Sequence, residues 1–93
     1  MSRNLEKDVQ RKVVMAARKA GWIALKQNPT GTTGYPDYMF LKKGVVRFIE
    51  FKSPTGKTSP IQDFRIEELE KQGFSVMVTS SEYEGKLFLD IKP

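Results

Sequence analysis

Two carboxylates and one lysine occupy positions where a small β-sheet would bring them together. Glu50 and Lys52 lie two residues apart in an apolar run, so in a strand their side chains would share one face. Asp37 opens another β-prone run, and a Lys-Lys-Gly turn between the runs predicts a hairpin. Such a hairpin would place Asp37 beside the end of the Glu50 strand.

A divalent cation is the simplest reason for two carboxylates to converge in this way. Close carboxylates repel each other unless a cation lies between them, and oxygen ligands suit Mg²⁺ or Mn²⁺. An ordinary ion pair would also explain Glu50 and Lys52, and Asp37 could be a turn residue following a proline. The convergence of all three favours a catalytic metal site.

Composition removes most other kinds of catalysis. The chain contains no cysteine and no histidine, which excludes Ser-His-Asp and Cys-His mechanisms and argues against zinc. A net charge of +5 favours a polyanionic partner such as nucleic acid. Thr55-Gly56-Lys57-Thr58 is similar to the end of a P-loop, but Phe51 stands where the first glycine is needed. We therefore expect no nucleotide cofactor.

The elements that must position these residues form an α/β sheet packed against helices, expected as one domain over residues 1–93. The strand carrying Glu50 is apolar on both faces, which predicts that both faces are covered. The expected order is α-β-β-β-α-β: a helix at 5–20, strands at 22–27, 37–41 and 45–52, a helix at 60–72, a strand at 74–79, and a possible extra C-terminal strand at 87–91.

Location is expected to be cytoplasmic. No apolar run approaches the roughly 20 residues that span a bilayer, and the N-terminus has no hydrophobic signal region. The lack of cysteine fits a reducing compartment. We expect no membrane contact.

The motif Gly34-Tyr35-Pro36-Asp37, followed on the next strand by Glu50-Phe51-Lys52, resembles the VRR-NUC branch of the PD-(D/E)XK nucleases. The resemblance covers nearly the whole chain and implies a restriction-endonuclease-like core. It also implies that Asp37, Glu50 and the carbonyl of Phe51 bind Mg²⁺ or Mn²⁺. By the same resemblance, Lys52 helps to position or activate the attacking water.

Glu6 and Gln62 match further positions of the family. Glu6 falls in the apolar sector of the first helix, so we expect it to face the protein and complete the metal site, directly or through water. Its alternative role is an interaction with the helix dipole. Gln62 would steady a water or Lys52, but Ser59 to Gln62 is also a capping box, which explains Gln62 without any catalytic task.

The resemblance implies a metal-dependent deoxyribonuclease. Stand-alone members of the family resemble Holliday-junction resolvases, which cut branched DNA as dimers, and such compact domains are frequent in phages and prophages. We therefore expect a homodimer that cleaves four-way junctions, encoded by a phage or its bacterial host. Two alternatives stay open: a nuclease of flaps, nicks or duplex ends, and a non-catalytic DNA-binding subunit with the same fold.

Overall fold

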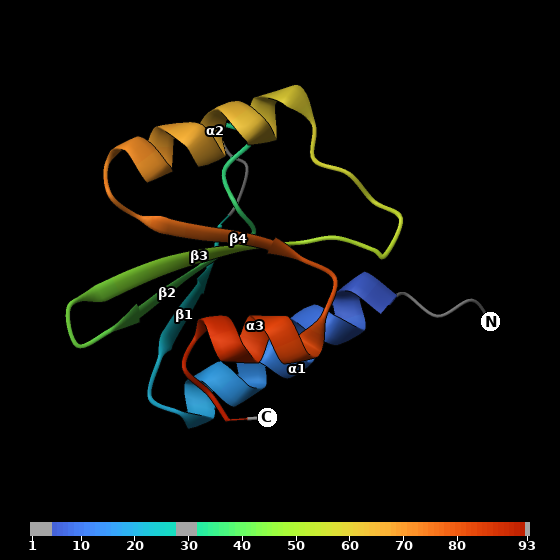
Figure 1. The fold of residues 1–93 in the computed structure, drawn as a ribbon. Helices are drawn as coiled ribbons and strands as arrows, with labels where there is room; N and C mark the ends of the chain where they lie inside the picture. The colour runs from blue at the N-terminus through green and yellow to red at the C-terminus, as the bar shows by residue number, and fades with distance from the viewer. Residues whose placement is uncertain (1–4, 28–31, 93) are drawn as a thin grey trace.

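A computed structural model describes residues 5–27 and 32–92. Within these residues the chain forms a four-stranded sheet with helices on both faces, α2 on one side and α1 and α3 on the other (Figure 1). The elements are α1 (Leu5–Lys19), β1 (Ile23–Lys26), β2 (Tyr38–Lys42), β3 (Val45–Phe51), α2 (Pro60–Lys71), β4 (Ser75–Thr79) and α3 (Glu82–Phe88). The expected α/β class is confirmed, with one helix added at the C-terminal end.

The sheet has the strand order β1-β2-β3-β4, with the first three strands antiparallel and β4 parallel to β3. The predicted hairpin joins β2 and β3, where Lys43 and Gly44 both have positive φ as a tight hairpin turn requires. Its register pairs Tyr38 with Ile49. The start of β2 therefore lies beside the end of β3, as the sequence predicted.

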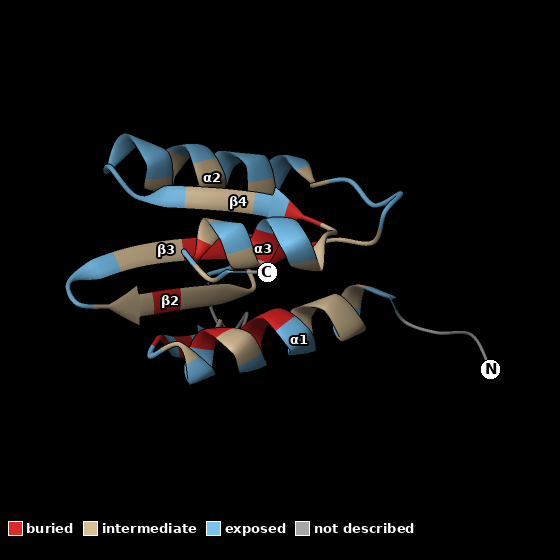
Figure 2. Cartoon of the chain, turned by 60° about the horizontal axis from the view of Figure 1, so that its bottom comes forward, coloured by how far each residue is buried: buried red, intermediate tan, exposed pale blue. Residues whose placement is uncertain are grey.

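The hydrophobic core lies between the sheet and the pair of helices α1 and α3. Alternation along β3 directs Ile49 and Phe51 to this side, where both are fully buried. Figure 2 shows buried segments of α1 and of the strands. The buried cluster comprises Val13, Val14, Ala17, Trp22, Ala24, Phe40, Ile49, Phe51 and Leu89.

The opposite face of the sheet is much more open. None of the residues of α2 is buried, and Phe64 on this helix is 57% exposed. Phe74 is also exposed. The apolar character of Phe64 and Phe74 predicts core positions, and this prediction is wrong for both. The helical angle of Phe64 places it about 160° from Gln62, on the side of α2 away from the sheet. The rings of Phe74 and Phe48 pack in a T-shaped arrangement, with their centroids 5.9 Å apart.

The expected strand at 87–91 is wrong, because residues 87 and 88 belong to helix α3 and a turn follows at residues 89 and 90. Ser81 caps this helix by accepting a hydrogen bond from the backbone N–H of Glu84. Gly85 is buried against Val13, and a Cβ at this glycine would lie 3.0 Å from Val13 Cγ2. Leu89 then enters the core, where its carbonyl accepts from Trp22 Nε1 at 3.0 Å. Tertiary packing of α3 on α1 thus overrides the local β-propensity.

The spacing of apolar residues predicts that the first helix buries one face, made by Leu5, Val9, Val13, Ala16 and Ala20. The helix buries a slightly different stripe. Val13 is buried as expected, but Val14 and Ala17 are the other buried residues of α1, and Leu5 is exposed. The stripe is therefore rotated toward α3, which packs against this helix. No helix in the described part of the chain is long and apolar enough to cross a membrane.

Candidate metal-binding active site

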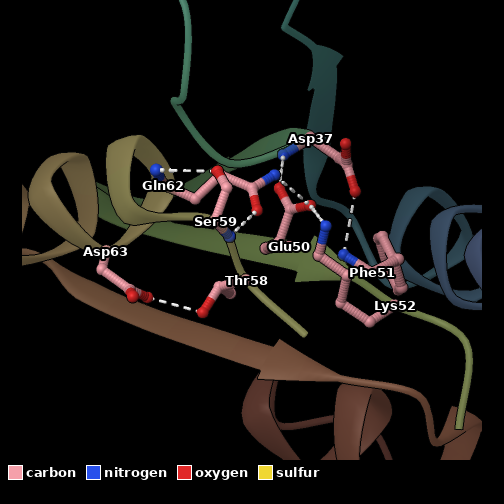
Figure 3. Close-up of polar contacts among 8 residues, drawn as sticks. All are labelled: Asp37, Glu50, Phe51, Lys52, Thr58, Ser59, Gln62 and Asp63. Carbon is pink, nitrogen blue, oxygen red and sulfur yellow. Dashed lines mark hydrogen bonds and ion pairs between the residues drawn. The ribbon is translucent and has the colours of Figure 1, made fainter. Parts of the chain in front are cut away.

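Hydrogen bonds at the end of the β2–β3 pair tie Asp37 to the Glu50 strand (Figure 3). The backbone N–H of Asp37 donates to Glu50 Oε1 at 3.1 Å. In return, the backbone N–H of Phe51 donates to Asp37 Oδ2 at 2.9 Å. Each carboxylate is thus oriented by the backbone of the neighbouring strand, and the two acids are held together as the sequence predicted.

Glu50 is the most enclosed charged group of this site, with only 3% of the residue exposed. Its Oε2 accepts from Gln62 Nε2 at 3.0 Å and lies 3.2 Å from Lys52 Nζ. Lys52 is itself only partly exposed. The ion pair between Glu50 and Lys52 is therefore real, but it is largely withdrawn from water and lies beside a second carboxylate, unlike an ordinary surface pair.

The electrostatics of Glu50 point to a shortage of positive charge. Burial raises the pKa of Glu50 above its usual value, and the charge of Asp37 raises it further. The ammonium of Lys52 lowers this pKa but does not outweigh the two opposing effects. The charged form of Glu50 thus remains unfavourable even beside Lys52, and a further cation at the site would stabilise it.

Gln62 takes part in both of the predicted arrangements at once. Its side-chain Oε1 accepts from the backbone N–H of Ser59 at 2.9 Å, and Ser59 Oγ accepts from the backbone N–H of Gln62, so the capping box is present. The other end of the amide, Nε2, donates to Glu50. The cap therefore fixes the orientation in which Gln62 meets the buried acid.

Known proteins are similar to this chain in sequence and in fold. The family model of the VRR-NUC domain matches residues 2–82. The chain belongs to the VRR-NUC family. A solved structure described as a VRR_NUC domain is similar to this one, with a TM-score of 0.83 and 27% sequence identity over 95% of this chain and 97% of that chain. No curated protein matches the chain significantly.

Membership of the VRR-NUC family gives the chain a nuclease-type fold and confirms the resemblance seen in the sequence. The residues that carried this resemblance, Asp37, Glu50 and Lys52, are also those that the structure brings together. The family match supports the nuclease-type fold, and the assignment of the site residues rests on their geometry.

Glu6 is not brought into this group. It is partly exposed in the first turn of α1, and among the described residues no three acidic side chains come close enough to hold a metal ion together. The first turn of α1 and the end of β3 do lie toward the same end of the molecule in Figures 1 and 2. A direct role for Glu6 as a third ligand thus has no support in this geometry.

Tyr35 contacts two residues of α2 near the site, Arg65 and Glu68, and no pattern in the sequence predicts these contacts. The Tyr35 hydroxyl donates to Glu68 Oε1, and Arg65 lies over the Tyr35 ring. The partners in the first contact are separated by 33 positions in the chain. An aromatic residue in a loop is expected to pack against that loop, so the partners of Tyr35 on α2 are a finding of the structure.

Proposed function

We propose that this VRR-NUC protein is a metal-dependent DNA endonuclease with its active site at Asp37, Glu50 and Lys52. The observation that carries the proposal is the buried carboxylate of Glu50, which is bonded to the Asp37 backbone and lies 3.2 Å from Lys52 Nζ. Family membership and the net charge of +5 support a nucleic-acid substrate.

The donor atoms at this site fit Mg²⁺ or Mn²⁺. The carboxylates of Asp37 and Glu50 and the carbonyl of Phe51 would hold the ion, all through hard oxygen atoms. Burial and, after it, the charge of Asp37 raise the pKa of Glu50, which supports this assignment because a bound cation would favour the charged form against both effects. When bound, the ion would polarise a phosphoryl oxygen and lower the pKa of a coordinated water. Glu6 would act only through an intervening water.

The chain's own residues would orient the reactants around this ion. Lys52 would stabilise the negative charge that develops on the scissile phosphate and help to orient the attacking water. Gln62 would keep Glu50 in place and contact the water or the lysine, since its amide is already fixed by Ser59. The product would be a cleaved phosphodiester, formed by hydrolysis.

The proposed substrate is branched DNA, with four-way junctions first, cut by a homodimer. Paired cuts require two active sites, and a 93-residue chain supplies one such site. Ile23 and Leu25 on the edge strand β1 are 59% and 42% exposed on the face away from Ala24. A second copy would cover such apolar side chains better than a phosphate backbone would. A phage or bacterial origin and a cytoplasmic location remain part of this proposal.

Cleavage of a labelled synthetic four-way junction tests the proposal, beside linear duplex, flap and single-stranded DNA. The protein is incubated with Mg²⁺, Mn²⁺ or EDTA as wild type, Asp37→Ala and Lys52→Ala. Lys71→Ala is the matched control, because Lys71 pairs with Glu67 on the exposed surface of α2. We expect metal-dependent paired cuts that both site variants lose, by at least about 100-fold, and that the control keeps.

Other results would redirect the assignment. Cutting mainly of flaps or duplex ends would keep the active site and remove the junction preference. Junction binding without cutting in either metal would leave a DNA-binding subunit. Light scattering on the same samples measures the assembly state, and a monomer that makes paired cuts would contradict the homodimer.

A further inference from the structure

Helix α2 brings Gln62 to the active site, although no residue of this helix is buried. A helix without a buried face gains little from the hydrophobic effect, so its position depends on specific contacts. Several such contacts lie on one edge of α2, against the segment that leads into Asp37. These contacts therefore determine where α2 lies relative to the segment that leads into Asp37.

Polar contacts attach this edge of the helix to residues 33–35. The Tyr35 hydroxyl donates to Glu68 Oε1, and Arg65 Nε donates to the carbonyl of Thr33 at 3.0 Å. Arg65 also lies 3.5 Å from Glu68 Oε2 and 4.9 Å above the centroid of the Tyr35 ring. Arg65 and Glu68 lie one turn apart on α2. Arg65 therefore binds the backbone of the segment, and Glu68 binds the Tyr35 side chain.

The backbone of residues 33–35 also approaches the start of α2 very closely, at Gly34. Gly34 has a φ of +89°, and a Cβ there would lie 2.8 Å from Ile61 Cγ1 and 3.0 Å from the Ile61 carbonyl oxygen. A side chain at this position would have to push the helix away. Glycine thus permits the close approach that the contacts of Tyr35 and Arg65 require.

These contacts complete a ring of interactions around Glu50. Buried Pro36 joins Tyr35 to Asp37, whose N–H donates to Glu50. Gln62, on the helix that Tyr35 holds, donates to the other oxygen of the same carboxylate. Movement of α2 relative to residues 33–36 would therefore shift Gln62 relative to Asp37, and these two residues donate to different oxygens of the buried acid.

We propose that Tyr35, Arg65 and Glu68 form a latch that positions Asp37 and Gln62 around Glu50 and so sets how tightly the site holds its divalent ion. The metal part of this inference rests on the proposed function, whereas the positioning part does not. The competing explanation is that the three residues only stabilise α2. That explanation predicts a lower melting temperature with an unchanged site.

The Mn²⁺ dependence of junction cleavage separates these explanations. Tyr35→Phe and Glu68→Gln each remove part of the latch, and their matched controls are Tyr83→Phe on the exposed side of α3 and Glu67→Gln on α2. We expect the latch variants to need about tenfold more Mn²⁺ for half-maximal cleavage, with the maximal rate largely restored at saturation. Unchanged Mn²⁺ dependence in both latch variants would overturn the metal part of the proposal.

Amide hydrogen exchange in the metal-free protein tests the positioning directly. The N–H groups of Asp37 and Phe51 make the two hydrogen bonds that join the acids, so the latch variants should exchange faster at both. The two controls should match wild type. Unchanged exchange at these amides would overturn the latch. If wild type cleaves nothing, faster exchange in the latch variants would still support the latch while the nuclease proposal failed.

Discussion

The two faces of the sheet are held by different kinds of interaction. On the side of α1 and α3, Phe40, Ile49 and Phe51 are completely buried in one apolar cluster. On the side of α2 no residue of the helix is itself buried, and its contacts with the site are polar. The side chains of Glu50, Lys52 and Gln62 in the candidate active site lie on this second, weakly packed side.

The two faces therefore have different roles: the face toward α1 and α3 stabilises the fold, and the face toward α2 carries the candidate site. A carboxylate with a raised pKa, such as Glu50, is unfavourable at neutral pH, so the site adds little to the stability of the metal-free protein. The core on the other face can offset that penalty. Substitutions should therefore affect stability on one face and activity on the other.

The largest expected effect contrasts two phenylalanines, one on each side. Phe40→Ala should lower the free energy of unfolding by about 3–5 kcal/mol, because it leaves a cavity in the core. Phe64→Ala removes the same atoms from an exposed site and should lose under about 1 kcal/mol. Urea denaturation of both variants measures the difference. Equal losses would show that the α2 face contributes as much to stability as the core does.

The central part of the site could be predicted because it depends on local rules. A period of two residues puts Glu50 and Lys52 on one face, and the hairpin turn at Lys43-Gly44 sets the register that brings in Asp37. Gln62 was predicted for the same reason, since the capping box fixes its place in the first turn of α2. Short-range geometry was sufficient in each case.

The remaining features depend on contacts between distant parts of the chain. Helix α3 takes up the start of the expected strand, and its Gly85 packs closely against Val13 on the first helix, a contact that local sequence does not reveal. The helical angle of Glu6 indicates a direction but gives no distance to the acids on the sheet. The contact between Tyr35 and Glu68 depends on how α2 sits on the sheet, which no local pattern encodes.

A smaller effect compares the two serine N-caps. Ser59→Ala and Ser81→Ala should each lower the free energy of unfolding by about 1 kcal/mol, because each leaves a backbone N–H of its helix without its acceptor. Only the cap of α2 also fixes Gln62, so only Ser59→Ala should reduce junction cleavage severalfold. Thermal melts and cleavage rates measure the two effects. A similar decrease in cleavage for Ser81→Ala would contradict the special role of the α2 cap.

The smallest expected change in stability is an increase. In the metal-free protein, Asp37→Asn should raise the free energy of unfolding. The new amide oxygen can still accept from the Phe51 N–H, while the charge that raises the pKa of Glu50 is removed. A carboxyl with a raised pKa stabilises the fold when protonated and loses that contribution as pH rises through its folded-state pKa. Removal of Asp37's charge should therefore matter little at about pH 4 and add up to about 1 kcal/mol at about pH 7.

Urea denaturation in EDTA at the two pH values tests this expectation, with Asp90→Asn as the control. Asp90 is exposed and pairs with Arg47 at 2.9 Å, so its substitution should produce no gain at neutral pH. An Asp37→Asn protein that is no more stable than wild type at neutral pH would mean that repulsion between the two acids is negligible. A gain that appears only at neutral pH, together with lost cleavage, would assign the Asp37 charge to metal binding, because a carboxylate kept for folding would not destabilise the fold.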